Sequence, residues 1–325
     1  MNVLVLSYND VVRLLPMEAC IEVMADALRT TNQGGAVLPL RSVVWKPDRT
    51  GMIGLMPGFL DPPTSLGLKV VSIFPGNHGT GFDSHQGVVM LFDTRHGSPL
   101  AIIDASSITA IRTAAVSADA TRALARDDAG DLAILGSGVQ ATTHLAAMRA
   151  VRKIRRVRVW SRSQANAQQF AAKADIAVEV VATPRAAVEG ADLICTTTAS
   201  REPVLEGAWL APGVHINAAG ACFATARELD TAAVARARLV VDRMESALAE
   251  SGDFLLARQD GAIGDDHILG ELGDLLLGRF AARRGADDVT LFKSLGIAIE
   301  DLAAAHHVYS QAVALGGGVS VPLGL

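Results

Sequence analysis

A glycine-rich turn in the middle of the chain, Gly136-Ser-Gly138-Val-Gln-Ala141, has the residue types that bind a pyrophosphate. It fits the pattern G-x-G-x-x-A, and it lies between a strand-like run at 132–135 and a helix-like run. The first glycine permits a tight turn, the second lets the backbone approach phosphate, and the small third residue lets helix and strand pack closely. The helix N-terminus then offers N–H groups to the phosphates. The pattern predicts a dinucleotide site, and a glycine turn without nucleotide is the alternative.

The end of the next predicted strand indicates which nicotinamide cofactor fits. An Asp or Glu at this place binds the ribose of NAD(H), whereas an arginine suits the 2′-phosphate of NADP(H). The chain has Ser161, Arg162 and Ser163 here and no carboxylate. Because Arg162 can form charge-assisted bonds to a phosphate, we expect NADP(H) to be favoured, with NAD(H) as the alternative. The alternative is that Arg162 is a solvated arginine in a turn with no role in cofactor binding.

Three cations of the first 112 residues lie among apolar neighbours. Arg41 follows VLPL, Lys69 lies within GLKVV, and Arg112 interrupts SITAIRTAAVSA. A charge is costly to bury unless it is paired, and no Asp or Glu is close in sequence to Lys69 or Arg112. Each could extend to solvent or meet a carboxylate distant in sequence. Together, in a chain that binds a hydride carrier, they suggest a pocket for an anionic substrate.

Composition excludes several classes of partner. The net charge of −5 gives no basic surface, so we expect no nucleic-acid partner. A short run of cations at 152–158 alternates with apolar residues and predicts the solvated edge of a strand. No apolar span approaches the roughly 20 residues of a membrane helix, and we expect a soluble protein without a membrane partner.

Cysteine and histidine positions predict neither disulfides nor metal. The three cysteines, at 20, 195 and 222, are widely spaced, which favours a reduced, cytoplasmic protein. His78, His306 and His307 do not have metal-ligand spacing with carboxylates, so we expect no metal.

A chain of 325 residues with half of them hydrophobic is expected to form two domains. Up to about residue 104, strand-like runs (RSVVW, GMIGLM, GLKVVSIFP and GVVMLFD) predict an antiparallel sheet with a helix or two. A helix is expected at 108–125. From 131 to 242 apolar strands alternate with helices, which predicts a parallel sheet covered on both faces. A long final helix is expected at 291–315.

The series GMIGLMPGF, GLKVVSIFPGN, HQGVVMLFD, SITAIRTAAVSA, ILGSGVQA, GVHINAAGA, REL and TLFKSLGIAIEDLAAA resembles the ornithine cyclodeaminase/mu-crystallin family over essentially the whole chain. The resemblance implies an α/β fold with a Rossmann-type doubly wound parallel sheet. Beside it, a discontinuous α+β domain with an antiparallel sheet would bind substrate and mediate homodimerisation. The expected domains are residues 1–115 with 300–325, which bind substrate, and residues 116–299, which bind the dinucleotide.

Carried over by position, the resemblance makes Arg41 and Arg112 the clamp for the substrate carboxylate and puts Lys69 beside the reacting C–N bond. Lys69, crowded by cations and desolvated, is expected to have a lowered pKa and to donate a proton near neutrality. The positions implied to contact the cofactor are Thr113, Gly136, Gly138, Val139, Gln140, Ser161, Arg162, Ser163, Thr198, Ala218 and Ser294.

Two positions depart from family members that cyclise ornithine. Those members have a Glu where this chain has Gly54, and an Asp where it has Cys222. Without these carboxylates, the distal ammonium group of a diamine substrate has no anionic partner at these positions. Cys222 is expected to line the substrate pocket, and His85 is expected to face the substrate or to be structural.

The resulting hypothesis is NAD(P)H-dependent reduction of a small cyclic imino acid, 1-pyrroline-2-carboxylate or 1-piperideine-2-carboxylate, to proline or pipecolate. One alternative is an alanine-type dehydrogenase of an open-chain amino acid, and another is an ornithine or lysine cyclodeaminase. A third, of a different class, is a non-catalytic, NADPH-binding crystallin-like protein.

Overall fold

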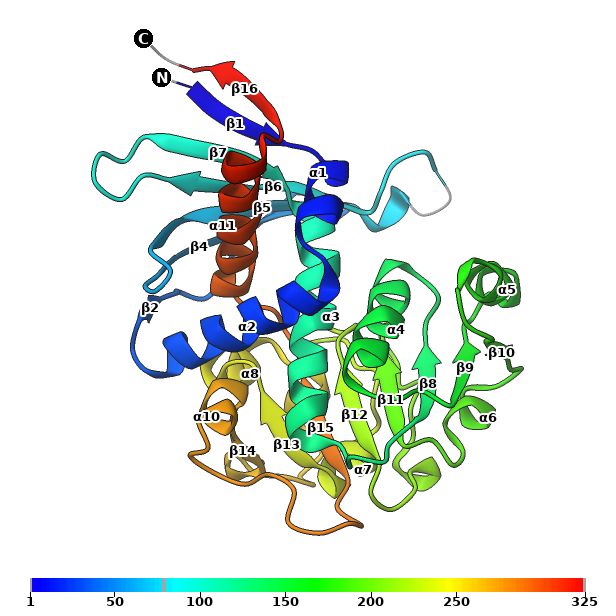
Figure 1. Ribbon diagram of the computed structural model, residues 1–325. Helices are drawn as coiled ribbons and strands as arrows, with labels where there is room; N and C mark the ends of the chain where they lie inside the picture. Colours follow the sequence, from blue (N-terminus) through cyan, green and yellow to red (C-terminus); the bar gives the residue numbers. More distant parts are fainter. Residues whose placement is uncertain (1, 78–79, 324–325) are drawn as a thin grey trace. The chain divides into compact units, whose positions relative to one another are not determined.

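The computed structural model describes residues 2–77 and 80–323, so His78 lies outside the described residues. The chain forms two compact units (Figure 1). Met1–Arg112 with Ile297–Leu325 is called the mixed-sheet unit here, and Thr113–Gly296 the parallel-sheet unit. The division between the two units, after Arg112, falls within the sequence of the helix α3, Ala105–Leu124.

In its described residues the mixed-sheet unit has eight strands in the order β16-β1-β7-β6-β5-β4-β2, with β3 paired to β4. Neighbours are antiparallel except β1 and β7, which are parallel. The predicted antiparallel sheet is therefore confirmed apart from this pair. The elements are β1 Asn2–Leu6, α1 Tyr8–Leu14, α2 Met17–Asn32, β2 Ala36–Val37, β3 Ser42–Trp45, β4 Met52–Leu60, β5 Ser65–Ile73, η1 Pro75–Asn77, β6 His85–Phe92, β7 Pro99–Asp104, α11 Ala298–Leu315 and β16 Val319–Pro322.

One face of this sheet is packed under α11, which lies against β4, β5 and β6 (Figure 1). The close approach depends on Gly58 and Gly67, which face each other across β4 and β5. A Cβ at Gly67 would lie 2.1 Å from the Met90 carbonyl oxygen and 2.9 Å from Leu302 Cδ2. Only glycine fits there, and this packing brings the start of α11 onto the buried face of β5.

The parallel-sheet unit has the strand order β10-β9-β8-β11-β12-β15-β13-β14 in its described residues, with every pair parallel. The order reverses between β8 and β11, as in a doubly wound sheet, so the predicted fold class is confirmed. The strands are β8 Asp131–Leu135, β9 Arg156–Trp160, β10 Glu179–Val180, β11 Leu193–Thr196, β12 His215–Ala218, β13 Arg238–Val241, β14 Ile268–Glu271 and β15 Thr290–Lys293. The helices are α4 Val139–Val151, α5 Gln164–Lys173, α6 Pro184–Val188, α7 Thr231–Arg236, α8 Met244–Glu250, α9 Gly252–Gln259 and α10 Leu272–Leu276, with turns η2 Gly207–Trp209 and η3 Asp265–His267.

The prediction of one helix over 291–315 is wrong at its start. Thr290–Lys293 forms β15, fully buried between β12 and β13, and the helix begins only at Ala298. Gly296 has φ +74°, a left-handed conformation that ends the strand segment before the helix. Apolar runs of this length do not distinguish a buried strand from a buried helix.

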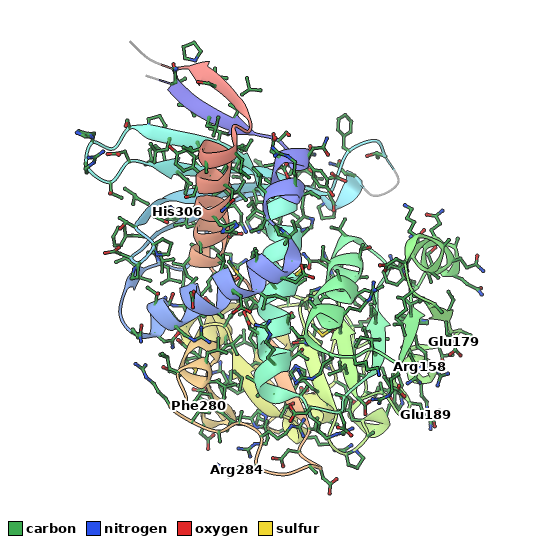
Figure 2. The ribbon with its side chains drawn as sticks, in the orientation of Figure 1. Arg158, Glu179, Glu189, Phe280, Arg284 and His306 are labelled. Carbon is green, nitrogen blue, oxygen red and sulfur yellow. The ribbon has the colours of Figure 1, made fainter. Side chains whose placement is uncertain are left out.

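The expected solvated strand edge at 152–158 is also wrong at one residue. Arg158 on β9 is buried, and its Nη1 donates to the carbonyl oxygens of Ala186 and Glu189 at the end of α6 (Figure 2). Those carbonyls have no partner within the helix, so the arginine satisfies them. Arg156, two residues earlier, is exposed as predicted.

Candidate active site

Lys69 lies in the middle of β5, on the face covered by α11. Its neighbours across the strands are Met56 on β4 and Val89 on β6, both buried and apolar. Lys69 itself is 3% exposed. An ammonium group in such a place needs a counterion, because burying an isolated charge is prohibitively costly.

The counterions are two acidic residues in the first turn of α11. Asp301 Oδ2 lies 2.7 Å from Lys69 Nζ. The other oxygen of the same carboxylate, Oδ1, accepts a hydrogen bond from Arg112 Nε at 3.0 Å, and Glu300 Oε2 accepts one from Arg112 Nη1 at 2.6 Å. Both acids are fully buried, and their position at a helix N-terminus also favours negative charge. Two cations and two carboxylates thus form one buried ion cluster.

The pKa values of this cluster reflect its burial. Burial lowers the pKa of Lys69 to about 8; Asp301 opposes this effect, while Arg112 and Arg41 reinforce it. Burial by itself raises the pKa of Asp301, but Arg112 and Lys69 outweigh it, so the pKa of this carboxyl is below its usual value. The predicted lowering for Lys69 is confirmed. An amine with a pKa near 8 can give up a proton near neutral pH.

Of the five residues expected at the substrate, the mixed-sheet unit brings Lys69 and Arg112 together on one carboxylate. The alternative that each meets a carboxylate distant in sequence is therefore confirmed for both. Arg41 directly precedes β3, is half-buried, and its charge acts on Lys69. His85 is exposed. It lies on β6 four residues before Val89, the cross-strand partner of Lys69, which is a distance of about 13 Å along the strand.

The predicted nucleotide turn has the expected local structure. Gly136 follows β8 with φ +123°, and a Cβ there would lie 2.5 Å from Thr197 Oγ1. Gly138 is the N-cap of α4 with an ordinary φ of −88°, and no described atom lies within 4 Å of the place where its Cβ would project. The packing of the protein therefore does not require glycine at 138, whereas a pyrophosphate close to the backbone would. Val139, the first residue of α4, is 64% exposed.

The loop after β9 has the features expected of a site for the adenosine ribose. Ser137 Oγ donates to Ser161 Oγ at 2.9 Å and so connects this loop to the glycine turn. Ser163 is the N-cap of α5 and accepts from Asn166 N. Arg162 is exposed between them, and its guanidinium has no ion pair or hydrogen bond among the described residues. These residues fit a dinucleotide phosphate.

Glu228 organises the loops that follow β11 and β12. Its carboxylate accepts hydrogen bonds from Thr196 Oγ1, Thr198 N, Thr198 Oγ1 and Gly220 N at 2.6–2.8 Å. Asp253 Oδ1 accepts from the backbone N of Glu228, and Asp253 Oδ2 lies 3.0 Å from the buried Lys293 Nζ. The hydroxyl of Thr198 is therefore engaged within the protein.

The other expected contact residues lie near these strand ends, on α3 or at the start of α4. Ala218 ends β12, and its carbonyl oxygen accepts from the backbone N of the buried Ser294. Thr113 is buried on α3, and Gln140 follows Val139 at the start of α4. Cys222 is half-buried, and its Sγ lies 3.7 Å from the Ala219 carbonyl oxygen.

The sequence analysis did not identify Glu300 and Asp301, the acidic residues of the ion cluster, or the buried Lys293. Glu300 and Asp301 stand in the apolar stretch GIAIEDLAAA, as conspicuous as Lys69 in GLKVV. Applying the same argument to anions as to cations would have identified them. Lys293 in TLFKSL has the same signal.

Among the described residues, no group of three or more His, Cys, Asp or Glu side chains is arranged to hold a metal ion. None of the three cysteines, all of them described, forms a disulfide. In the same part of the chain, each helix is too short or too polar to span a bilayer.

Comparison with known proteins assigns the family. The sequence profile of the ornithine cyclodeaminase/mu-crystallin family matches residues 1–316. The mouse protein "ketimine reductase mu-crystallin" is 43% identical over 278 residues, 86% of each chain. The structure of Thermococcus litoralis Delta(1)-pyrroline-2-carboxylate reductase with NADH and L-proline superposes with a TM-score of 0.96 at 38% identity, covering 98% of this chain and 100% of that one. An archaeal alanine dehydrogenase dimer with bound NAD gives 0.93 at 30% identity and 99% coverage of both. The chain belongs to the ornithine cyclodeaminase/mu-crystallin family.

Proposed function

We propose that this protein uses a reduced nicotinamide cofactor to convert a small cyclic imino acid, 1-pyrroline-2-carboxylate or 1-piperideine-2-carboxylate, into proline or pipecolate. The observation that carries the proposal is the pairing of Lys69 and Arg112 on Asp301 in a chain 38% identical to a reductase crystallised with NADH and L-proline. The mouse relative is named a ketimine reductase and the Thermococcus relative a pyrroline-2-carboxylate reductase, and both names describe reduction of a C=N bond.

The two cations of the cluster, Lys69 and Arg112, have separate roles in this reaction. Arg112, with Arg41, binds the substrate carboxylate by charge-assisted hydrogen bonds. Lys69 donates its proton to the imine nitrogen, which makes the adjacent carbon more electrophilic, and is left as a neutral amine. When bound, a reduced nicotinamide would supply the hydride to this carbon. The C=N double bond becomes a C–N single bond, and solvent returns a proton to Lys69.

The two departures at the site support a reductase over a cyclodeaminase. Gly54 on β4 is buried on the same face as Met56, the cross-strand partner of Lys69, so this position has no carboxylate for a distal amine. Cys222 likewise supplies no carboxylate. The assay mixes purified protein, NADPH and each cyclic imine, and follows loss of NADPH absorbance. The proposal fails if no turnover exceeds the rate without enzyme. Faster turnover of pyruvate with ammonia would favour the alanine-type alternative, which the archaeal relative represents.

We propose further that NADP(H) is preferred over NAD(H). The support is the exposed guanidinium of Arg162 beside Ser161 and Ser163, in a loop without a carboxylate at this place. The Thermococcus reductase and the archaeal alanine dehydrogenase were solved with NADH and NAD, so the preference for NADP(H) depends on this loop of this chain.

We also propose that the protein is a cytoplasmic homodimer. The outward face of the mixed sheet is apolar and half-exposed or exposed, which favours burial against a second copy. Its residues on β4, β5 and β6 are Ile53, Leu55, Pro57, Phe59, Leu66, Leu68, Val70, Val88, Met90 and Phe92. The archaeal relative is a dimer. The odd number and wide spacing of the cysteines, at 20, 195 and 222, support a reducing compartment.

A further inference from the structure

We propose that Asp301 is a positioning residue of the reductase, whose one carboxylate holds the ammonium of Lys69 and the guanidinium of Arg112 in fixed places relative to each other. The inference rests on the proposed function for its catalytic meaning. Its geometric basis is that each oxygen of the Asp301 carboxylate contacts a different cation. Oδ2 lies 2.7 Å from Lys69 Nζ, and Oδ1 lies 3.0 Å from Arg112 Nε. Asp301 is fully buried, so no solvent competes for either oxygen.

Because each oxygen contacts one cation, the Asp301 carboxylate holds both the Lys69 ammonium and the Arg112 guanidinium in place. A lysine side chain has four rotatable bonds and no directional donor plane, so its ammonium needs an anchor to stay in one place. Arg112 is anchored twice, through Nε to Asp301 and through Nη1 to Glu300. A guanidinium is planar and rigid, so bonds from Nε and Nη1 to two different carboxylates fix the orientation of the whole group.

Asp301 also opposes the other influences on the proton of Lys69. The charged groups that act on Lys69 are Asp301 from α11, Arg112 from α3 and Arg41 before β3, while the flanking strands present Met56 and Val89. Burial and both arginines favour the neutral amine, and Asp301 favours the ammonium. Without this carboxylate, Lys69 would lose its proton at lower pH and would be a poorer donor near neutrality.

Glu300 provides a matched comparison on the same turn of α11. It is fully buried, carries the same charge, and also binds Arg112, at 2.6 Å. The ion pair with Lys69, however, is made by Asp301. A general loss of buried negative charge would affect both acids alike, whereas positioning of the proton donor should depend on Asp301.

The experiment compares wild type, Asp301→Asn and Glu300→Gln as holoenzymes. For each, kcat/KM for the cyclic imine is measured against pH, with melting temperature and NADPH affinity as checks of folding. The active form is protonated Lys69, so kcat/KM should fall above its pKa of about 8. In D301N we expect this falling limb to move down by roughly 1–3 pH units. In E300Q we expect a higher KM for the imine and an unmoved limb. An unmoved limb in folded D301N, or an equal movement in E300Q, would overturn the proposal.

A second readout is independent of turnover. The lysines of the chain, Lys46, Lys69, Lys153, Lys173 and Lys293, are few enough to titrate by NMR after incorporation of ¹³C-lysine. The Lys69 resonance should titrate at lower pH in D301N than in wild type. If wild type reduces no imine, the proposed function fails, yet this titration still decides the assignment of Asp301.

If D301N does not fold, Asp301→Glu replaces it, since this variant keeps the charge and changes its reach. We expect D301E to keep the falling limb of wild type and to lose kcat. Wild-type kcat in D301E would refute a positioning role.

Discussion

Replacing Lys69 by methionine tests the proposed proton donor directly. Methionine has a similar length without the charge, and the site between Met56 and Val89 is already apolar. General acid catalysis contributes about 10²–10⁴-fold, so kcat near neutral pH should fall by that factor. At 1.36 kcal/mol for each factor of ten, the barrier rises by about 3–5.5 kcal/mol. Binding of substrate should weaken less, because Arg112 remains on Glu300 and Asp301.

The pH dependence makes this prediction sharper than a loss of rate. With a pKa of about 8, Lys69 is mostly protonated near neutrality, and the protonated fraction drops about tenfold for each pH unit above the pKa. The ratio of the wild-type rate to the K69M rate should therefore shrink about tenfold per unit in alkaline solution. Because both enzymes receive the same imine, ionisation of the substrate cancels in the ratio.

The assay is NADPH oxidation at saturating cofactor, with the pH varied from neutral to strongly alkaline. Lys46→Met is the matched control, since Lys46 is an exposed lysine paired with Asp48 and should retain wild-type kinetics. Melting curves and NADPH affinity show whether K69M is folded. A rate within a few-fold of wild type, or a ratio that stays constant as the pH rises, would refute the role given to Lys69.

Three further predictions concern the cofactor, the packing and the assembly. Arg162→Ala should lower kcat/KM with NADPH at least tenfold, the size of one lost charge-assisted phosphate contact, and leave NADH nearly unaffected; equal losses would contradict the phosphate role. Gly67→Ala should lower the free energy of unfolding by about 1–3 kcal/mol, because its Cβ would collide with the Met90 carbonyl oxygen. Gly138→Ala, whose Cβ would meet no described atom, should keep the wild-type melting temperature and weaken NADPH binding. Leu68→Asp, on the outward face of β5, should yield monomers in light scattering, and a persistent dimer would place the interface elsewhere.

The local pattern of the chain predicted most of the fold. Alternating strands and helices from 131 to 241 were evident because parallel strands buried on both faces are continuous apolar runs. The strand-like runs before residue 104 likewise predicted an antiparallel sheet, to which the pair of β6 and β7 belongs. The strand Thr290–Lys293 was not, because its neighbours β12 and β13 are distant in sequence and its apolar pattern continues into α11. Only the placement in the sheet separates that strand from the helix.

The site shows the same limit. Residue types identified Lys69 and Arg112 as charges needing partners. The partners of Arg112 lie 188 and 189 residues away, and Asp301 is still farther in sequence from Lys69, so only the fold could bring them together. The link is the glycine pair of β4 and β5, which seats α11 with its acidic first turn over the sheet. Close packing of α11 against the backbone of the sheet thus determines which charges meet. The spacing of residues in the sequence does not reveal this packing.

The energetics of the ion cluster favour a functional explanation over a structural one. Desolvating two cations and two carboxylates offsets most of their mutual attraction, and apolar residues of similar volume would stabilise such a site as well or better. Removing a single partner is a different matter, because a buried charge left unpaired costs about 3–5 kcal/mol. Stability therefore explains why Lys69, Arg112, Glu300 and Asp301 must occur together, but not why they occur at all. Proton transfer to an imine beside an anchored carboxylate needs an amine of lowered pKa in one fixed place, and this cluster provides both.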